Sequence, residues 1–343
     1  MNTIYVNDKN NIKAVQNAVD SLPKEGGTVV ITKGEQLTSA IHLKSNVTLH
    51  IEENALLKFS TDFNDYLPPV FTRWEGVECY NYSPFIYAHN CENIKICGKG
   101  SIDGMGQVWW HWKKLQGDAA TKLCRAQSEG ILPKDRVFAT EEAALRPSFI
   151  QFINCKNITF KDFTIKNGPQ WTIHPVYCEN VTAQNLTVLT QGPNTDGLNP
   201  DSCNNVLIEN CTFDTGDDCI AINSGLNEDG WRVNRPCQNV EIKNCTFKGG
   251  HAAIAIGSGM SGGVQNIYAH NCIISNTERG IRIKSMKGRG GYVKDVTFKN
   301  IKMSNIELDD IQVTTNYGSS TAVPVSDKAP VFSNFKFENI NVD

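Results

Sequence analysis

Three aspartates are the residues of this 343-residue sequence that are best suited to chemistry. Asp196 ends the segment Asn-Thr-Asp, and Asp217 and Asp218 end the segment Gly-Asp-Asp. Glycoside hydrolysis needs such carboxyl groups, because one must protonate the leaving oxygen while another activates water or attacks. Crowding three aspartates raises the pKa of at least one of them through like-charge repulsion. The alternative is that aspartates beside glycines are only turn residues.

Further reactive side chains follow at regular intervals. His251 lies 33 residues after Asp218, Arg282 lies 31 residues after His251, and Tyr317 lies 33 residues after Lys284. If each interval is one turn of a solenoid, these residues stack on one face, with neighbouring coils about 4.8 Å apart. Arg282 and Lys284 then point the same way from one strand and form a clamp for a substrate carboxylate. The alternative for these two cations is a solvated strand face.

A repeat predicts the elements that must position these residues. The pair Asn-Ile or Asn-Val recurs along the chain and is followed each time by a short alternating apolar run; the asparagines are Asn93, Asn157, Asn180, Asn205, Asn239 and Asn266. Such runs of β-branched residues between Asn, Gly and Asp turns are typical of short strands. A repeat of this length with two or three strands indicates an all-β solenoid, a parallel β-helix. The repeated asparagines are expected to form hydrogen-bonded ladders.

The repeat has a different beginning and one long interruption. Residues 11–22 have apolar residues at helical spacing between Asn11 and Pro23, which predicts a helix that caps the open end of the solenoid. Residues 103–147 form a Trp-rich insertion that is expected near the substrate cleft. Its tryptophans, Trp109, Trp110 and Trp112, serve either packing or substrate contact. We otherwise expect residues 1–343 to form a single solenoid domain.

Composition excludes several other classes of protein. The chain carries 33 Lys and Arg against 36 Asp and Glu, which argues against a nucleic-acid partner. No apolar run is long enough for a membrane span, and the start MNTIYVNDKN lacks the apolar region of a signal peptide. The expectation is a cytoplasmic protein, or a secreted one if a leader was removed. The sequence carries no signal for an oligomeric state.

The twelve cysteines fit the same expectation. Five of them share the pattern Cys-x-Asn just before a predicted strand; they are Cys91, Cys155, Cys178, Cys203 and Cys237. This regular placement predicts a ladder of buried thiols rather than disulfides. The chain has no Cys-x-x-Cys pair, so a zinc ribbon is not expected.

The order and spacing of these motifs resemble the polygalacturonase family of glycoside hydrolases. The segments NTD and GDD, a Gly-His pair, RIK and a late Tyr carry the resemblance, and GSIDGMGQVWW, GPNTDGLNPDS and GRGGYV resemble the bacterial, exo-acting branch. The resemblance covers nearly the whole chain. It implies a right-handed parallel β-helix that hydrolyses α-1,4-linked galacturonate in polygalacturonate or oligogalacturonides, with inversion and without a metal or other cofactor.

The resemblance also implies roles for the residues. Asp217 would be the general acid, Asp196 and Asp218 would hold and activate water, and His251 would tune the protonation of the acid. The substrate would be bound by Asn194, Arg282, Lys284 and Tyr317. For an inverting enzyme we expect acid and base about 6.5–9.5 Å apart. The chain departs from the bacterial pattern at Asn223, where a lysine is usual, so one cation near the site is missing.

Other functions remain alternatives. One is hydrolysis of a related pectic glycoside, such as rhamnogalacturonan or xylogalacturonan, although Arg282 and Lys284 favour galacturonate. Another is a non-catalytic β-helix that binds polysaccharide, against which the aspartates argue. A pectate lyase on the same fold would need Ca²⁺ and an arginine base.

Overall fold

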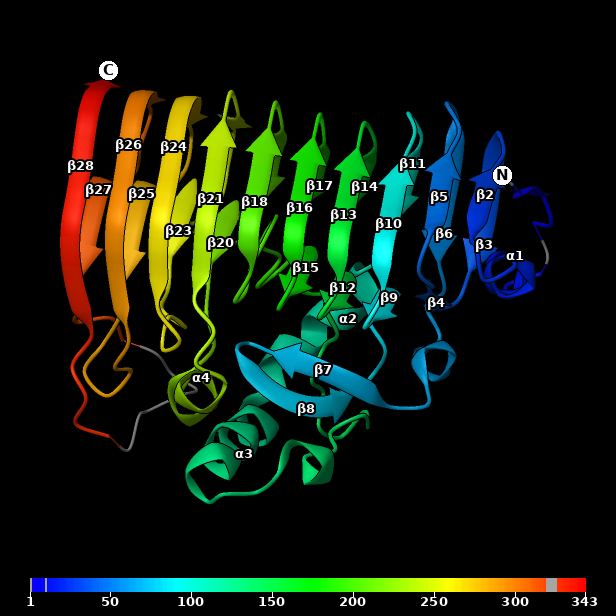
Figure 1. Ribbon diagram of the computed structural model, residues 1–343, viewed down its shortest axis with the longest axis horizontal. Helices are drawn as coiled ribbons and strands as arrows, with labels where there is room; N and C mark the ends of the chain where they lie inside the picture. The colour runs from blue at the N-terminus through cyan, green and yellow to red at the C-terminus, as the bar shows by residue number, and fades with distance from the viewer. Residues whose placement is uncertain (1, 10, 319–325) are drawn as a thin grey trace.

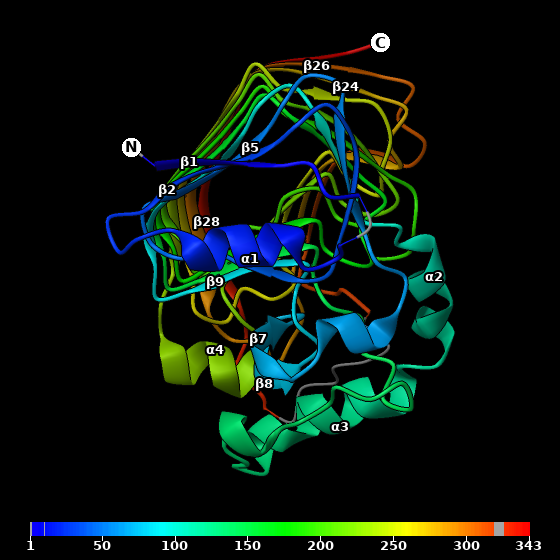
Figure 2. The ribbon, with the colours of Figure 1, turned by 90° about the vertical axis from the view of Figure 1, so that its right-hand side faces the viewer.

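The computed structural model describes residues 2–9, 11–318 and 326–343. Figure 1 shows a row of coils stacked from the N-terminus to the C-terminus, and every pairing between strands of successive coils is parallel. This is the expected right-handed parallel β-helix. A side wall of helices and one hairpin lies along the lower side of the stack (Figures 1 and 2).

One large sheet contains eighteen strands and makes up two runs of stacked strands. The first run contains the six strands that include the repeated asparagines, together with strands at both ends of the stack: β1 (Asn2–Val6), β2 (Gly27–Ile31), β5 (Val47–Ile51), β10 (Glu92–Cys97), β13 (Lys156–Lys161), β16 (Glu179–Gln184), β18 (Asn204–Glu209), β21 (Cys237–Lys243), β24 (Val264–Ser275), β26 (Tyr292–Ser304) and β28 (Val331–Val342). The second run contains β3 (Gly34–Thr38), β6 (Ala55–Phe59), β11 (Ser101–Asp103), β14 (Thr164–Lys166), β17 (Thr187–Thr190), β19 (Thr212–Thr215) and β22 (Thr246–Phe247).

The remaining face of the solenoid is built from two four-stranded parallel sheets. Its strands are β4 (Ile41–His42), β9 (Ile86–His89), β12 (Ile150–Ile153), β15 (Ile173–Val176), β20 (Ile220–Ile222), β23 (Ile254–Ile256), β25 (Arg279–Lys284) and β27 (Asp309–Thr314). Residues 198–201 bridge β15 to β20, so the two sheets form one continuous surface. We call this surface the catalytic face, because the predicted reactive residues lie on it or just before it.

Asparagine corners hold the coils in register. All six repeated asparagines adopt a left-handed backbone conformation, with φ between 55° and 60°. Asparagine tolerates this conformation better than other non-glycine residues. The side chain of Asn180 donates to Asn157 at 2.9 Å, and that of Asn205 donates to Asn180 at 2.8 Å. The predicted ladder is confirmed over these coils; at Asn239 it shifts by one position, because Asn239 donates to Asn204 instead.

Apolar residues fill the interior of every coil. Ile158, Val181, Val206, Val240 and Ile267 occupy equivalent buried positions in successive strands. All twelve cysteines are free thiols, and the five of the predicted ladder precede or begin consecutive strands of the same run. Four of them are fully buried and Cys91 is partly buried. The register of the repeat is thus fixed by apolar burial and by the corners together.

The cap at the N-terminus is shorter than predicted. Helix α1 spans Ala14–Ser21 and not 11–22, and it lies across the end of the stack (Figure 2). Asn11 is not its N-cap; its side chain accepts from the backbone N–H of Lys13 in the turn before the helix. Val15 and Val19 are buried against the first coil. A strand that the sequence analysis missed, β1, precedes the helix and pairs with β2.

The side wall consists of residues 70–81, 107–135 and 227–233. It contains the antiparallel hairpin β7 (Val70–Trp74) and β8 (Val77–Asn81), the helices α2 (Gln107–Trp110), α3 (Gly117–Ser128) and α4 (Asn227–Val233), and the 3₁₀ turns η2 (His111–Lys114) and η3 (Pro133–Asp135). A further 3₁₀ turn, η1, spans Phe63–Tyr66. The side wall covers part of the outer side of the catalytic face.

Two of the three tryptophans of the insertion serve packing. Trp109 and Trp112 are buried and contact Phe63 edge-on or at a tilt. Trp110 donates its indole N–H to the carbonyl of Gly168. Within the described residues, no helix is both long and apolar enough to cross a membrane.

Candidate active site

The predicted reactive residues lie on the catalytic face or on the turns beside it. Asp196 follows β17, Asp217 and Asp218 lie between β19 and β20, and His251 lies between β22 and β23. Arg282 and Lys284 are on β25, and Tyr317 follows β27. The coil register therefore gathers the predicted residues into one region, as the spacing predicted.

A cavity of about 230 Å³ lies over these turns. Asn194, all three aspartates, Lys284 and Tyr317 line it, whereas Arg282 and His251 do not. The side wall supplies Glu75 from the hairpin, and Lys113 and Cys124 from the insertion. The insertion thus borders the cavity as predicted, but through Lys113 and Cys124 instead of its tryptophans.

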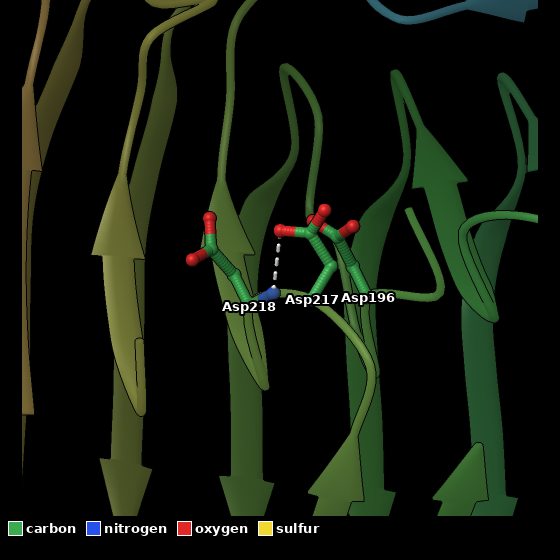
Figure 3. Close-up of side chains that lie close together, drawn as sticks. All are labelled: Asp196, Asp217 and Asp218. Carbon is green, nitrogen blue, oxygen red and sulfur yellow. Dashed lines mark hydrogen bonds between the residues drawn. The ribbon is translucent and has the colours of Figure 1, made fainter. Parts of the chain in front are cut away.

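The three aspartates lie on two neighbouring turns. Figure 3 shows their carboxyl groups projecting the same way, and one oxygen from each lies within 4.8 Å of the others. Asp217 accepts a hydrogen bond from the backbone N–H of Asp218 at 2.9 Å. The turn needs Gly216, because a Cβ there would lie 2.3 Å from the carbonyl oxygen of Gly192 on the adjacent coil. Backbone packing between coils therefore sets the spacing of the carboxyl groups.

This spacing corrects one expectation. The closest carboxyl oxygens are nearer than the 6.5–9.5 Å that is typical of inverting glycosidases. The reason is that adjacent coils lie about 4.8 Å apart, so residues on neighbouring turns are brought closer than that range. Carboxyl separation alone therefore does not indicate inversion here.

The three aspartates differ in the direction in which their surroundings shift the pKa. Burial and the charges of Asp217 and Asp218 raise the pKa of Asp196 well above its usual value. Burial also raises the pKa of Asp218, against the opposing effect of Lys284. Burial acts the same way on Asp217, but its hydrogen bond to His251, the charges of His251 and Lys284 and the hydrogen bond from the backbone of Asp218 together outweigh burial and lower its pKa. The two carboxyl groups with raised pKa values are therefore those of Asp196 and Asp218, and not that of Asp217.

His251 connects the aspartates to a residue that sequence reasoning missed. Its Nδ1 lies 3.2 Å from Asp217 Oδ1, and its Nε2 lies 3.4 Å from Glu278 Oε1. The hydrogen bond to Asp217 and the charges of both acids raise the pKa of His251. The imidazolium is thereby held between two carboxylates. Glu278 stands next to Arg279 at the start of β25 and carried no motif of its own.

Lys284 is engaged within the protein. Its ammonium lies 2.6 Å from Asp218 Oδ2, with both side chains buried. The other oxygen of Asp218, Oδ1, is buried and has no hydrogen-bond partner among the described residues. Arg282 instead donates to Gln312 at 2.8 Å. Both cations lie 5.3 Å from the ring of Tyr317, so they share one aromatic neighbour rather than forming a symmetrical clamp.

Asn194 is fixed by a buried arginine that the sequence analysis did not single out. Arg146 donates to Asn194 Oδ1 at 2.7 Å, and Asn194 faces Asp217 Oδ2 with its amide at 3.4 Å. Arg146 also donates to the carbonyls of Pro169 and Pro193 and to Gln116. Burial lowers the pKa of Arg146 to about 10. Arg146 is therefore a positioning residue that holds the turn carrying Asp196.

The aspartates also have the spacing of a cation site. Carboxylate oxygens are ligands that Mg²⁺ and Ca²⁺ prefer. The ammonium of Lys284 already provides a positive charge at Asp218. The expectation of a metal-free reaction stays a prediction, and a chelation experiment tests it below.

Comparisons with known proteins agree with this geometry. The profile of "Glycosyl hydrolases family 28" matches residues 134–343. A probable polygalacturonase of Vitis vinifera is 34% identical over 346 residues, covering 96% of this chain and 65% of that protein. The exo-poly-alpha-D-galacturonosidase of Dickeya chrysanthemi is 28% identical, covering 97% of this chain and 59% of that protein. This chain thus spans about three fifths to two thirds of the length of these relatives.

A solved structure is similar over nearly the whole chain. The hyperthermoactive exopolygalacturonase of Thermotoga maritima superposes with a TM-score of 0.93 at 35% identity. The superposition covers 99% of this chain and 81% of that one. The matched residues include the three aspartates of the cavity, His251, Lys284 and Tyr317. The chain belongs to glycosyl hydrolases family 28.

Proposed function

We propose that this protein is an exo-acting polygalacturonase that hydrolyses α-1,4-linked galacturonate with inversion. One observation carries the proposal. Three aspartates share a cavity in which one of them pairs with an imidazole and another with a buried ammonium. Glycoside hydrolysis needs an acid and a base in this arrangement, and a polyuronate needs a cation nearby.

The reaction would run as a single displacement. Asp217 gives a proton to the glycosidic oxygen as the bond from this oxygen to the anomeric carbon breaks. Water attacks the anomeric carbon from the opposite side, and its proton passes to Asp196 or Asp218. Asp218 Oδ1 is a buried oxygen without a partner and is suited to accept a hydrogen bond from that water. Because the pKa of Asp196 is raised well above its usual value, its carboxylate accepts a proton more readily than an ordinary aspartate does.

The pair of Asp217 and His251 would supply the acid proton. The pKa of Asp217 is lowered and that of His251 is raised. At any pH between these two pKa values, the two side chains together hold one proton. In the free enzyme that proton resides on the imidazole, and the 3.2 Å contact allows its transfer to Asp217. Activity should therefore fall as the pH rises through the pKa of His251. It should also fall at low pH as the water-activating aspartates become protonated.

Exo action is supported by the side wall and by the relatives. Glu75, Lys113 and Cys124 border the cavity, so the substrate meets a wall on this side. The relatives from Dickeya chrysanthemi and Thermotoga maritima are both named as exo-acting.

Product analysis on polygalacturonate tests this proposal. We expect a single small uronate early in the reaction, whereas a mixture of oligomers would mean endo action. Asp217→Asn keeps the shape of the acid but removes the donated proton, so it should lower kcat by about 10²- to 10⁴-fold. Substrate binding should survive in this variant, because a general acid acts mainly in the transition state.

The same assay separates the other candidate functions. Activity that persists in EDTA and gives no unsaturated product excludes a Ca²⁺-dependent lyase. Loss of activity in EDTA would show that the aspartates hold a required cation. Absence of reducing sugar from any pectic substrate would indicate a polysaccharide-binding protein instead.

A further inference from the structure

Arg289 lies at the cavity without a role in the mechanism above. It belongs to the loop between β25 and β26, and its backbone is held in place by its neighbours. Trp231 donates its indole N–H to the carbonyl of Arg289 at 2.9 Å, and the N–H groups of Gly288 and Gly290 both donate to the carbonyl of Lys328. The side chain is 1% exposed and lines the cavity of the aspartates. The position of the guanidinium is therefore fixed by the fold.

The guanidinium of Arg289 has few partners. Nη1 donates to Asn227 Oδ1 at 3.1 Å, and Nε is buried without an acceptor. Within residues 2–9, 11–318 and 326–343 it takes part in no ion pair, and the titratable groups acting on it are Cys124 and Tyr317. Asn227 is thus the one acceptor that the described part of the chain provides for five N–H donors.

The other buried arginines of the described chain are better satisfied. Arg73 lies 2.9 Å from Asp201 and also donates to Ser202 and to the carbonyl of Gly76. Arg136 lies 2.7 Å from Asp229 and donates to the carbonyls of Glu78 and Ile131. Arg146 has four acceptors. Arg289 is therefore distinguished by its lack of acceptors and not by burial.

A buried cation without an anionic partner lowers stability, so such a group in a cavity is suited to an anionic ligand. The guanidinium fork matches a carboxylate, which can accept two parallel hydrogen bonds. Lys284 lies in the same cavity but is already paired with Asp218, and Tyr317 is close to both cations. The cavity therefore contains two cations that differ in state, because Lys284 already has a carboxylate partner and Arg289 has none among the described residues.

We propose that Arg289 binds the carboxylate of a second galacturonate, on a different sugar from the one near Lys284. This inference rests on the proposed function. It makes Arg289 a specificity-determining residue, because Arg289 and Lys284 together would then require a free carboxylate on each of two sugars. Substrates esterified at the second sugar should bind weakly for this reason.

Binding of trigalacturonate to Asp217→Asn protein, measured by calorimetry, tests the proposal without turnover. Adding Arg289→Met should weaken binding about 10- to 150-fold, the equivalent of one charge-assisted contact. The fully methyl-esterified trisaccharide should bind equally well, within about threefold, with and without Arg289→Met. A purely structural role would weaken the acid and the ester alike, and that result would overturn the proposal.

Two further variants control the experiment. Arg125→Met removes an exposed arginine on α3, next to Cys124, and should leave both affinities unchanged. Arg289→Lys keeps the charge but not the fork, so it should bind the acid with intermediate affinity and keep the test valid if Arg289→Met does not fold. Equal binding of trigalacturonate with and without the guanidinium would refute the role of Arg289. Failure of the Asp217→Asn parent to bind any oligogalacturonide would instead refute the proposed function itself, and with it this inference.

Discussion

Apolar packing holds both the coils and the side wall, but the side wall combines it with buried arginine–carboxylate pairs. In the coils, equivalent apolar residues stack in successive strands and asparagine side chains bond from corner to corner. The side wall has a smaller apolar cluster, which includes Trp74 and Leu123, and it is also joined by ion pairs. Arg73 pairs with Asp201 and Arg136 with Asp229, with all four side chains buried, and the half-exposed Arg232 pairs with Glu78. The coils set the spacing of the aspartates through backbone register, whereas the side wall borders the cavity that receives the sugar. The coils thus determine where the reacting groups lie, and the side wall contributes to the shape of the substrate site.

Breaking an ion pair of the side wall should have the largest effect on stability. Arg73 and Asp201 have no exposed side-chain surface, and removing one partner of a buried pair costs about 3–5 kcal/mol. We expect Arg73→Met to lower the free energy of unfolding by this amount in urea denaturation. Arg235→Met is the matched control, because Arg235 pairs with Glu179 at the surface and should contribute about 1 kcal/mol or less. Similar losses in the two variants would contradict the distinction between coils and side wall.

The same contrast explains what could be predicted from the sequence. Strand periodicity and asparagine spacing placed the coils and brought Asp196, Asp217 and Asp218 together, because stacking converts sequence intervals into neighbours. The side wall follows no repeat, and the partners of its charges are far apart in sequence, as Arg73 and Asp201 are. Glu278, Arg146 and Arg289 lie outside the side wall, but they were missed for a related reason: their partners are also far away in sequence and belong to no shared motif. The ionic state of Asp217 was also missed, because it depends on its contact with His251.

Lys284 is the cation that the coils bring to the aspartates. We expect Lys284→Ala to raise KM on polygalacturonate by about 10- to 150-fold, the loss of one charge-assisted contact. Because Lys284 also pairs with Asp218, its removal should raise the pKa of that carboxyl group further, lower kcat and move the acid limb of the pH profile upward.

A methyl-esterified substrate separates the two effects of Lys284→Ala. The KM defect should shrink on it, since no carboxylate remains to be bound, while the kcat defect persists. Lys299→Ala, which removes a partly exposed partner of Glu338, should change neither constant. An unchanged KM in Lys284→Ala would show that Lys284 does not bind the substrate carboxylate, and would favour a neutral pectic sugar as substrate.

Glu278 should have the smallest effect, through His251. Its charge helps to raise the pKa of His251, so Glu278→Gln should lower this pKa. Half-exposed ion pairs are worth up to about 1 kcal/mol, so the alkaline limb of the kcat profile should move to lower pH by roughly 0.2–0.7 unit. Glu241→Gln is the control, because Glu241 contacts His270 on another face of the solenoid and should leave the profile unchanged. A shift to higher pH would contradict the assignment of the proton to the pair of Asp217 and His251.

The stereochemistry of the first product tests the central claim most directly, that Asp196 or Asp218 activates water while Asp217 protonates the leaving oxygen. Proton NMR of the freshly released sugar, recorded before mutarotation, measures it. A single displacement by water predicts that an α-linked substrate gives the β anomer first. Initial release of the α anomer would contradict the account, because it would require a covalent intermediate on one of the aspartates.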